Sequence, residues 1–307
     1  MERKAASVIM LTLLLVGMLT LAFNIRPVKA SGTVYIRANG SIDPPTAPIS
    51  TIDDVTYAFT DNIYDQIVVE RDNIVVDGAG HSLQGTGALG SEGIALSRRS
   101  NVTIKNMEIK AFSLGILLAS CSNINVVGNN VTANNWSGIV LWWSSNNYIA
   151  ENNVKANKGH GIHLFSSSNC NSIFRNNVKN NWHGISPEWS SNNTLRSNNM
   201  DGNDINFWLD GLSLSHFVHD IDASNTVDGK PVYYWVNEKD RVIPLDAGYV
   251  ALVNCTRITA HNLNLTKNGQ GILLAATTDS TITKNHLANN VHGIRFIGSS
   301  NNYVAGN

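Results

Sequence analysis

Apolar residues recur at fixed positions through the middle of the chain, in units of about 23 residues. Each unit opens with Gly-Ile-x-Leu or a close variant, and it later carries an Asn-Asn pair followed by Val or Met. The glycines of four successive units are Gly115, Gly138, Gly161 and Gly184, and the pairs begin at Asn129, Asn152, Asn176 and Asn198. This period predicts a solenoid, because a single unit cannot bury its apolar side until a neighbour stacks on it.

The pattern within each unit separates two solenoid classes that have this period. A leucine-rich repeat needs the Leu-x-x-Leu-x-Leu frame, which the chain lacks. Instead, short runs alternate apolar and polar residues, are rich in β-branched side chains and are bounded by Gly, Ser and Asn. We therefore predict an all-β fold, a right-handed parallel β-helix with about 22–24 residues per coil and one insertion.

Asparagine is unusually frequent, with 23 examples among residues 101–200. Asn tolerates the left-handed backbone of sharp turns, and its amide can bond to the Asn of the next coil in a stacked ladder. A disordered Asn-rich tract is the alternative. We reject it because the apolar residues keep fixed positions in every unit.

Residues 1–30 have the composition of a secretory signal peptide. Arg3 and Lys4 precede a 16-residue apolar run, and a cleavage site follows near Ala30. The run is shorter than the roughly 20 residues needed to span a membrane, so we expect a secreted protein, on the cell surface or in a periplasm-like space. Cleavage leaves 18 basic and 22 acidic side chains, a net charge of −4 that offers no basic surface for nucleic acid.

The mature chain divides into four parts. Residues 31–92 are expected to form an N-terminal cap and irregular first coils, and residues 93–209 the regular coils. Residues 210–247 fit no unit and are expected to be an insertion, after which residues 248–307 resume the repeat. The last coil is incomplete, so we expect a C-terminal continuation. Only such a region would attach this monomer to a membrane.

Three cysteines, an odd number for an exported protein, are far apart in the sequence. Counting from the next apolar residue places Cys170 and Cys255 in one column, about three coils or roughly 14 Å apart. A disulfide needs Cα atoms within about 7 Å. We therefore expect Cys121, Cys170 and Cys255 to be free and mostly buried.

The coils and the segment 221–235, IDASNTVDGKPVYYW, resemble exported right-handed β-helix proteins of the NosD-like group. The repeat of that group is also called the carbohydrate-binding and sugar-hydrolysis (CASH) repeat, and it is abundant on archaeal cell surfaces. The resemblance covers nearly all of residues 33–307. It implies an exported β-helix, and the family name implies a link to periplasmic copper delivery.

The outward positions of the Gly-Ile-x-Leu segments suggest sugar binding. With Ile and Leu pointing inward, the alternate residues form outward columns that contain His163 and, on adjacent coils, Trp142, Phe165 and Glu188. Trp189 follows directly, and all seven tryptophans lie within one hundred residues. Exposed aromatic rings offer flat apolar faces to sugars, although they can also simply cover the sheet.

Polysaccharide cleavage is an alternative function. Gly159-His160-Gly161 resembles the Gly-His-Gly of β-helix polygalacturonases, but the paired aspartates of that chemistry are missing from the preceding coils. We therefore interpret His160 as a turn residue. Lyase or epimerase chemistry needs a base beside a group that neutralises a carboxylate, and no such set stands out, so we assign no catalytic residue.

Two groups of residues are candidate metal ligands. His160 and His183 occupy the same position on adjacent coils, within about 5 Å. The insertion supplies a second group, which consists of His216, His219, Asp220 and Asp222. Imidazole and carboxylate ligands suit Cu(II) or Zn, whereas Cu(I) prefers sulfur, which is scarce in the mature chain. Copper or calcium is the ion expected if either group binds one, and ordinary surface histidines are the alternative.

Seven Asn-x-Ser/Thr sequons make glycosylation possible in an exported chain, and we expect some of them to be used. They begin at Asn39, Asn101, Asn130, Asn135, Asn192, Asn254 and Asn264. Taken together, the sequence predicts an exported surface protein that binds a polysaccharide or cell-surface glycan without cleaving it. Copper delivery and polysaccharide lyase, hydrolase or epimerase activity are the alternatives.

Overall fold

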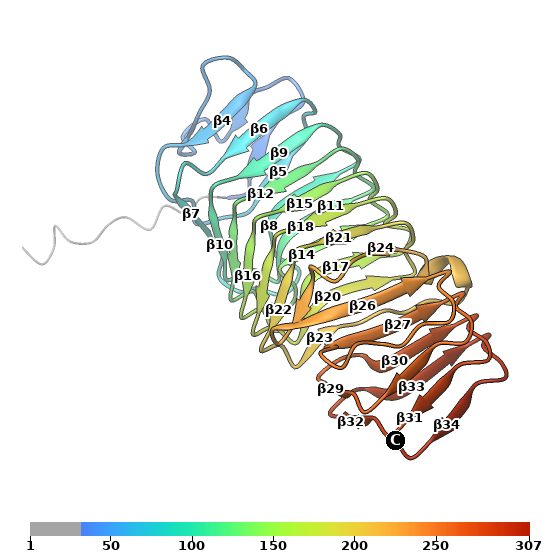
Figure 1. Ribbon diagram of the computed structural model, residues 1–307. Helices are drawn as coiled ribbons and strands as arrows, with labels where there is room; N and C mark the ends of the chain where they lie inside the picture. Colours follow the sequence, from blue (N-terminus) through green and yellow to red (C-terminus); the bar gives the residue numbers. More distant parts are fainter. Residues whose placement is uncertain (1–31) are drawn as a thin grey trace, which may run out of the picture. The chain divides into compact units, whose positions relative to one another are not determined.

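The computed structural model describes residues 32–307, which form a parallel β-solenoid of about 11 turns (Figure 1). The fold class predicted from the repeat is thus confirmed. The one helical segment of this region is the 3₁₀ turn η1 (Leu214–Phe217). No helix of the described part is long and apolar enough to cross a membrane. The predicted signal peptide and its cleavage site near Ala30 lie outside the described residues.

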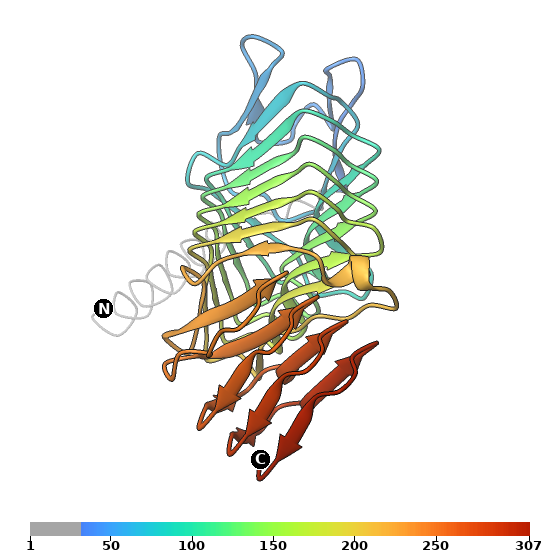
Figure 2. The ribbon, with the colours of Figure 1, turned by 45° about the vertical axis from the view of Figure 1, so that its right-hand side comes forward.

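Three long sheets form the faces of the solenoid (Figures 1 and 2). The first, called here the Gly-Ile sheet, contains β2 (Ile42–Asp43), β1 (Val34–Ile36), β5 (Ile67–Val69), β8 (Glu92–Ser97), β11 (Leu114–Ala119), β14 (Ile139–Trp142), β17 (His160–Phe165), β20 (His183–Glu188) and β23 (Ile205–Phe207). The middle sheet contains β3 (Ile49–Ser50), β4 (Thr56–Phe59), β6 (Ile74–Asp77), β9 (Val102–Lys105), β12 (Asn125–Val127), β15 (Tyr148–Ala150), β18 (Ser172–Phe174), β21 (Thr194–Arg196) and β24 (Asp220–Ile221).

The third sheet, called here the Asn-Val sheet, runs the length of the solenoid. It contains β7 (Ser82–Gln84), β10 (Glu108–Lys110), β13 (Asn130–Thr132), β16 (Asn153–Lys155), β19 (Asn177–Lys179), β22 (Asn199–Asp201), β25 (Thr226–Val227), β26 (Lys230–Val236), β27 (Tyr249–Val253), β30 (Gln270–Ala275) and β33 (His292–Ile297). Two short sheets complete the last coils: β28 (Thr259–His261), β31 (Thr281–Thr283) and β34 (Tyr303–Ala305), and β29 (Asn264–Thr266) with β32 (His286–Ala288).

The interior is a set of apolar columns in strict register. Ile116, Ile139, Ile162 and Ile185 pair from coil to coil, and each is fully buried. The glycine before each isoleucine is required by packing. A Cβ on Gly138 would lie 2.6 Å from Val154 Cγ1 and 2.8 Å from the carbonyl oxygen of Gly161. The repeated glycine therefore lets the Asn-Val sheet approach the Gly-Ile sheet closely.

Buried asparagines form hydrogen-bonded ladders along the corners of the coils. Oδ1 of Asn176 accepts hydrogen bonds from both the backbone N–H and the Nδ2 of Asn152, each at 3.0 Å. Nδ2 of Asn176 donates to the carbonyl of Ile149 at 2.8 Å and to Oδ1 of Asn198 at 3.0 Å. Similar ladders run through Asn134, Asn157, Asn181 and Asn203, and through Asn147, Asn171 and Asn193. The amide ladders expected from the composition are therefore present.

The segment 210–247, expected to be an insertion, contributes strands to the sheets. β24 pairs with β21 and β25 pairs with β22, so both continue the stacked coils. β26 then runs antiparallel to β25 and parallel to β27. The repeats after residue 247 consequently extend the Asn-Val sheet, and the Gly-Ile sheet ends at β23. Arg295 supports this change of sheet through an ion pair with Asp210.

All three cysteines are free, as expected, and Cys121 and Cys255 are buried. Cys170 is exposed, so the prediction of burial was wrong for this residue. The column assignment was also wrong, because the strands place Cys255 two positions away from the slot of Cys170. Cys255 donates its N–H to the Thr277 hydroxyl, as Cys121 does to the Ser144 hydroxyl. Cys170 has a φ of 56° and occupies the exposed turn position.

The ladder predicts that alanine substitution of two neighbouring asparagines lowers the free energy of unfolding by different amounts. Asn176→Ala would leave the buried N–H of Asn152 and carbonyl of Ile149 without these partners, and we expect it to lower the free energy of unfolding by about 2 kcal/mol. Asn177→Ala is the matched control, because the half-buried side chain of Asn177 bonds only to the side chains of Asn153 and Asn199. Urea denaturation measures both, and equal losses would contradict the ladder account.

Candidate functional site

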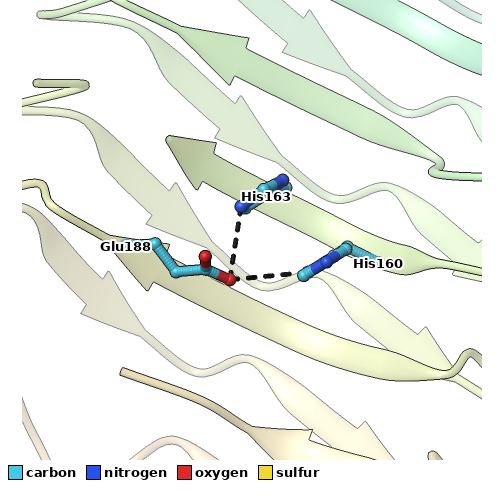
Figure 3. A group of neighbouring side chains, drawn as sticks. All are labelled: His160, His163 and Glu188. Atoms are coloured by element: carbon cyan, nitrogen blue, oxygen red, sulfur yellow. Dashed lines mark ion pairs between the residues drawn. The ribbon is translucent and has the colours of Figure 1, made fainter. Parts of the chain in front are cut away.

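The outward face of the Gly-Ile sheet carries a group of histidine and carboxylate side chains on β17 and β20. The register of these neighbouring strands pairs His160 with His183 and His163 with Ser186, and Glu188 follows two residues later on β20. Residues of adjacent coils thus lie one strand spacing apart. Figure 3 shows His160, His163 and Glu188 pointing toward one another.

Three potential ligand atoms converge in this group. Nε2 of His163 lies 3.3 Å from Oε1 of Glu188, and Nδ1 of His160 lies 4.0 Å from the same oxygen. The rings of His160 and His163 stack with their centroids 4.0 Å apart, and Nδ1 of His160 is 3.0 Å from the hydroxyl oxygen of Ser186. One ligand atom from each of the three residues lies within 4.8 Å of the other two.

Gly161 explains how His160 joins this face. A regular strand would place residues three apart on opposite sides, yet His160 and His163 stack on the same side. The pairing skips Gly161, whose Cβ would lie 2.4 Å from Val178 Cγ1 and 2.8 Å from the carbonyl oxygen of Gly184. The interpretation of His160 as a turn residue was therefore wrong: it begins β17 and is buried.

Burial keeps two of the histidines neutral. Burial, together with the neighbouring His163 and His183, lowers the pKa of His160 to about 2. Burial also lowers the pKa of His183 to about 4, against an opposing effect of Glu188. Both imidazoles are neutral at pH 7, so each keeps a nitrogen lone pair.

Two nitrogen atoms at this site, His163 Nε2 and His183 Nδ1, are buried without a hydrogen-bond partner. Glu188 is near His163 Nε2, but the contact does not have the geometry of a hydrogen bond. A buried polar atom without a partner costs about 1–3 kcal/mol. A ligand that satisfied either nitrogen would therefore be favoured.

Aromatic rings border the histidine group at the C-terminal ends of β14, β17 and β20. Trp142 pairs in register with Phe165, which in turn pairs with Glu188. The Phe165 ring lies 5.2 Å from that of His163 and 5.1 Å from that of Trp189. Trp142 stacks on Trp143, and both are exposed, Trp143 to 57%. The sequence-predicted ligand residues are thus brought together in one surface.

Two of these tryptophans occupy strained backbone positions. Trp143 and Trp189 have φ values of 51° and 49°, in the left-handed region that bulky residues avoid. The equivalent turn position holds Ser120 on the preceding coil and Ser166 between the two tryptophans. Folding alone would favour a small residue there. The backbone thus tolerates strain to hold two large rings at the surface.

Trp136 and Trp182 lie near the opposite, N-terminal ends of β14 and β20, and Trp208 directly follows β23. Trp182 is half exposed and stacks on His183 with the ring centroids 4.3 Å apart. The Trp208 ring covers the other side of His183 at 5.4 Å, and exposed Trp136 packs against Gly159. The histidine group is therefore flanked by aromatic rings at both ends of the strands. Sequence reasoning noted these residues but assigned them no role.

The four candidate ligands at 216–222 are not assembled into a metal site. His219 is buried, its Nδ1 accepts the backbone N–H of Asn193, and its Nε2 donates to the carbonyl of His216. Both ring nitrogens are thus occupied. Asp220 and Asp222 both pair with Arg196, at 2.6 and 3.0 Å. His219 instead takes the place of an asparagine at the end of a ladder.

The sequons lie where modification would need them. Six of the asparagines are exposed and Asn130 is half-buried. Glycosylation of any of the seven stays a prediction. The paired aspartates required for glycoside hydrolysis are absent from β14, β17 and β20, whose single carboxylate is Glu188.

The fold and the site define a parallel β-helix protein with a histidine and carboxylate group on an aromatic-rich face. The chain belongs to the family described as "Periplasmic copper-binding protein (NosD)", whose model matches residues 31–232 and 236–307. The predicted resemblance is thus confirmed. The description as periplasmic also indicates an exported protein.

Three solved structures have a similar architecture. They are the periplasmic alginate epimerase AlgG (16% identity, TM-score 0.43, covering 81% of this chain and 49% of that one), DFA-IIIase from Arthrobacter chlorophenolicus A6 (16%, 0.42, 78% and 62%) and alginate lyase from Paenibacillus sp. str. FPU-7 (13%, 0.43, 80% and 92%). The chain spans about half the length of AlgG. These weak similarities carry no argument about function. No match was found among curated proteins.

The copper implied by the family description can be tested against the residues of this face. Two imidazoles and one carboxylate suit borderline divalent ions such as Cu(II) and Zn(II). Calcium fits poorly, because it takes six to eight oxygen ligands. Among the described residues, no sulfur ligand for Cu(I) lies on β17 or β20: Met107, Met200, Cys121 and Cys255 are buried in the core, and exposed Cys170 lies in the turn before β18. His160, His163 and Glu188 therefore fit a divalent transition-metal ion.

Because buried His219 is neutral, we expect the folding stability of the protein to depend on pH in the acid range. Its pKa falls to about 4 in the folded protein, mainly through burial, against about 6.5 when unfolded. The unfolded state thus binds more protons, and stability should decrease as the pH falls from 6.5 to 4. His219→Asn would extend the asparagine ladder and preserve stability at pH 7. We expect it to reduce the slope of the unfolding free energy against pH by the equivalent of up to one proton. Unfolding midpoints across this pH range provide the measurement, and an unchanged slope would show the assignment to be wrong.

Proposed function

We propose that this protein binds a divalent transition-metal ion, Cu(II) or Zn(II), through His160, His163 and Glu188. The observation that carries the proposal is the convergence of three ligand atoms within 4.8 Å on one face. The family description as copper-binding supports it. The buried, unpartnered Nε2 of His163 adds a nitrogen that has no other hydrogen-bond role within the described structure.

The surroundings favour an ion over a proton at this position. Burial disfavours the protonated forms of His160 and His183, so the lone pairs are available at neutral pH. The hydroxyl of Ser186 lies 3.0 Å from Nδ1 of His160, which is also the nitrogen near Glu188, so an ion bound to this nitrogen would replace that hydrogen bond. Glu188 supplies the negative charge. The fixed strands hold all three ligands without a mobile loop.

Removal of the carboxylate tests the metal site. Glu188→Gln keeps the shape of the side chain but removes its charge, and we expect the affinity for Cu(II) and Zn(II) to fall at least about tenfold, because even indirect partners contribute 10–100-fold. Glu151→Gln is the matched control, since exposed Glu151 pairs with Arg175 on another face. Competition with a chromogenic chelator measures both, and equal affinities would refute the site.

A second function, non-catalytic binding of a polysaccharide, is favoured by the aromatic border of the same face. Trp142, Trp143, Phe165 and Trp189 lie together on three adjacent coils, and the three tryptophans are exposed. Rings that served only to cover the sheet would not need the strained positions of Trp143 and Trp189. We therefore infer that they stack against sugar rings. The single carboxylate of these strands supports binding without hydrolysis.

Substitution of one ring separates ligand binding from coverage of the sheet. Trp143→Asn places a residue that tolerates a positive φ at this turn, so stability should be maintained. Loss of one stacking partner should weaken polysaccharide retention roughly two- to tenfold. Tyr64→Ala is the control, because Tyr64 is equally exposed at 57% but lies in the N-terminal cap. Affinity electrophoresis measures the retention, and an assay of reducing ends detects cleavage. Unchanged retention in Trp143→Asn would contradict the proposal that these rings bind a polysaccharide.

A further inference from the structure

We propose that the metal ion and the aromatic border bind one ligand together, an acidic polysaccharide whose carboxylate completes the coordination of the ion held by His160, His163 and Glu188. This inference rests on the metal site proposed above. It assigns the site a role in recognition, and it makes glycan binding dependent on the metal.

The protein supplies only part of a coordination shell. The group of mutually close ligand atoms contains three residues, whereas Zn(II) takes four ligands and leaves one open position when the protein provides three. His183 is not in that group. Its ring lies between Trp182 and Trp208 and meets the His160 ring edge-on. An external oxygen atom is therefore needed to complete the shell.

The three ligand side chains lie on the face of the sheet from which a polymer would approach. His163 and Glu188 occupy outward positions on β17 and β20, and each side chain is 16% exposed. His160 is more deeply placed, with a side chain that is 11% exposed. The ligands are thus shielded enough to hold an ion and open enough for one group of a larger molecule to reach it.

Charge selects an acidic ligand. Without an ion the group carries the negative charge of Glu188, and this charge repels a carboxylate. Two neutral imidazoles, one carboxylate and a divalent ion give a net charge of +1, so the bound ion reverses the preference. Asp204 is a further negative group that acts on His183, and Asp210 is already neutralised by Arg295. The reversal therefore depends on the ion itself.

The aromatic rings set the direction of the ligand. Trp182 lies 6.1 Å from His160 near the start of the strands, and Phe165 lies 5.2 Å from His163 near their end, next to Trp189. A sugar chain that follows the strands across the ion can stack on rings at both ends while one of its carboxylates reaches the metal. A neutral sugar chain would keep the stacking but lose the coordination.

The test uses a uronic-acid trisaccharide, trigalacturonate, and its carboxyl-reduced neutral form. Both are titrated by calorimetry into the protein stripped with a chelator and into the protein with one equivalent of Zn(II). We expect the ion to tighten the binding of trigalacturonate at least about tenfold, which corresponds to about 1.4 kcal/mol of binding free energy. The affinity for the neutral trisaccharide should not change. Trp189→Ala should keep Zn(II) affinity while weakening trisaccharide binding, and Glu151→Gln should match the wild type.

The outcomes separate the two proposals. Loss of Zn(II) affinity and of the ion-dependent gain in Glu188→Gln supports both. If the wild-type protein fails to bind Zn(II), the proposal of the metal site is itself overturned. A wild-type protein that binds Zn(II) but holds trigalacturonate equally well with and without the ion overturns this inference and leaves the metal site standing. An equal gain for the neutral trisaccharide would also overturn it, because the carboxylate would then have no part.

Discussion

The side-chain amides of buried asparagines fix the relative positions of the coils. An Oδ1 inside a ladder, such as that of Asn176, accepts two hydrogen bonds from the coil before it, so a shift of one residue would leave several buried groups without partners. The register of the outward residues follows from this constraint. His163 meets Glu188, and Trp142 meets Phe165, because the asparagine ladders at the corners of the coils favour this alignment. The site is thus a product of the stacking.

Much of the fold could be predicted from the sequence because it repeats. The period gave the solenoid, the glycines and apolar columns gave the inward positions, and the outward columns of Trp142, Phe165 and Glu188 followed from alternation. Alternation failed where the backbone departs from it. Gly161 places His160 on the same face as His163, and no pattern of side chains signals that change. Cys170 was misplaced for another reason, because Ile258 occupies the coil position of Asn171 and not that of Ile173, so the next apolar residue is not the same reference point in the two coils.

The two groups of histidines show why ligands are difficult to assign from spacing alone. His216 and His219 have a short spacing and nearby aspartates, but His219 is used to end an asparagine ladder and the aspartates bind Arg196. His160, His163 and Glu188 were assigned to separate candidate sites, one for metal and one for sugar. The structure joins them because residues about 25 positions apart lie on neighbouring strands. Proximity in a solenoid depends on the coil period.

The change of sheet at β25 and β26 has a consequence for any polymer bound on the outer face. The Gly-Ile sheet ends at β23, and the later Gly-Ile repeats continue the Asn-Val sheet instead (Figure 2). The aromatic and histidine residues of β14, β17 and β20 therefore have no counterpart aligned beyond that strand. The proposed binding surface is therefore bounded along the solenoid axis. A glycan that follows the strands, as proposed, would meet one ion and one set of rings, so the face would act as a single clamp and not as a continuous track.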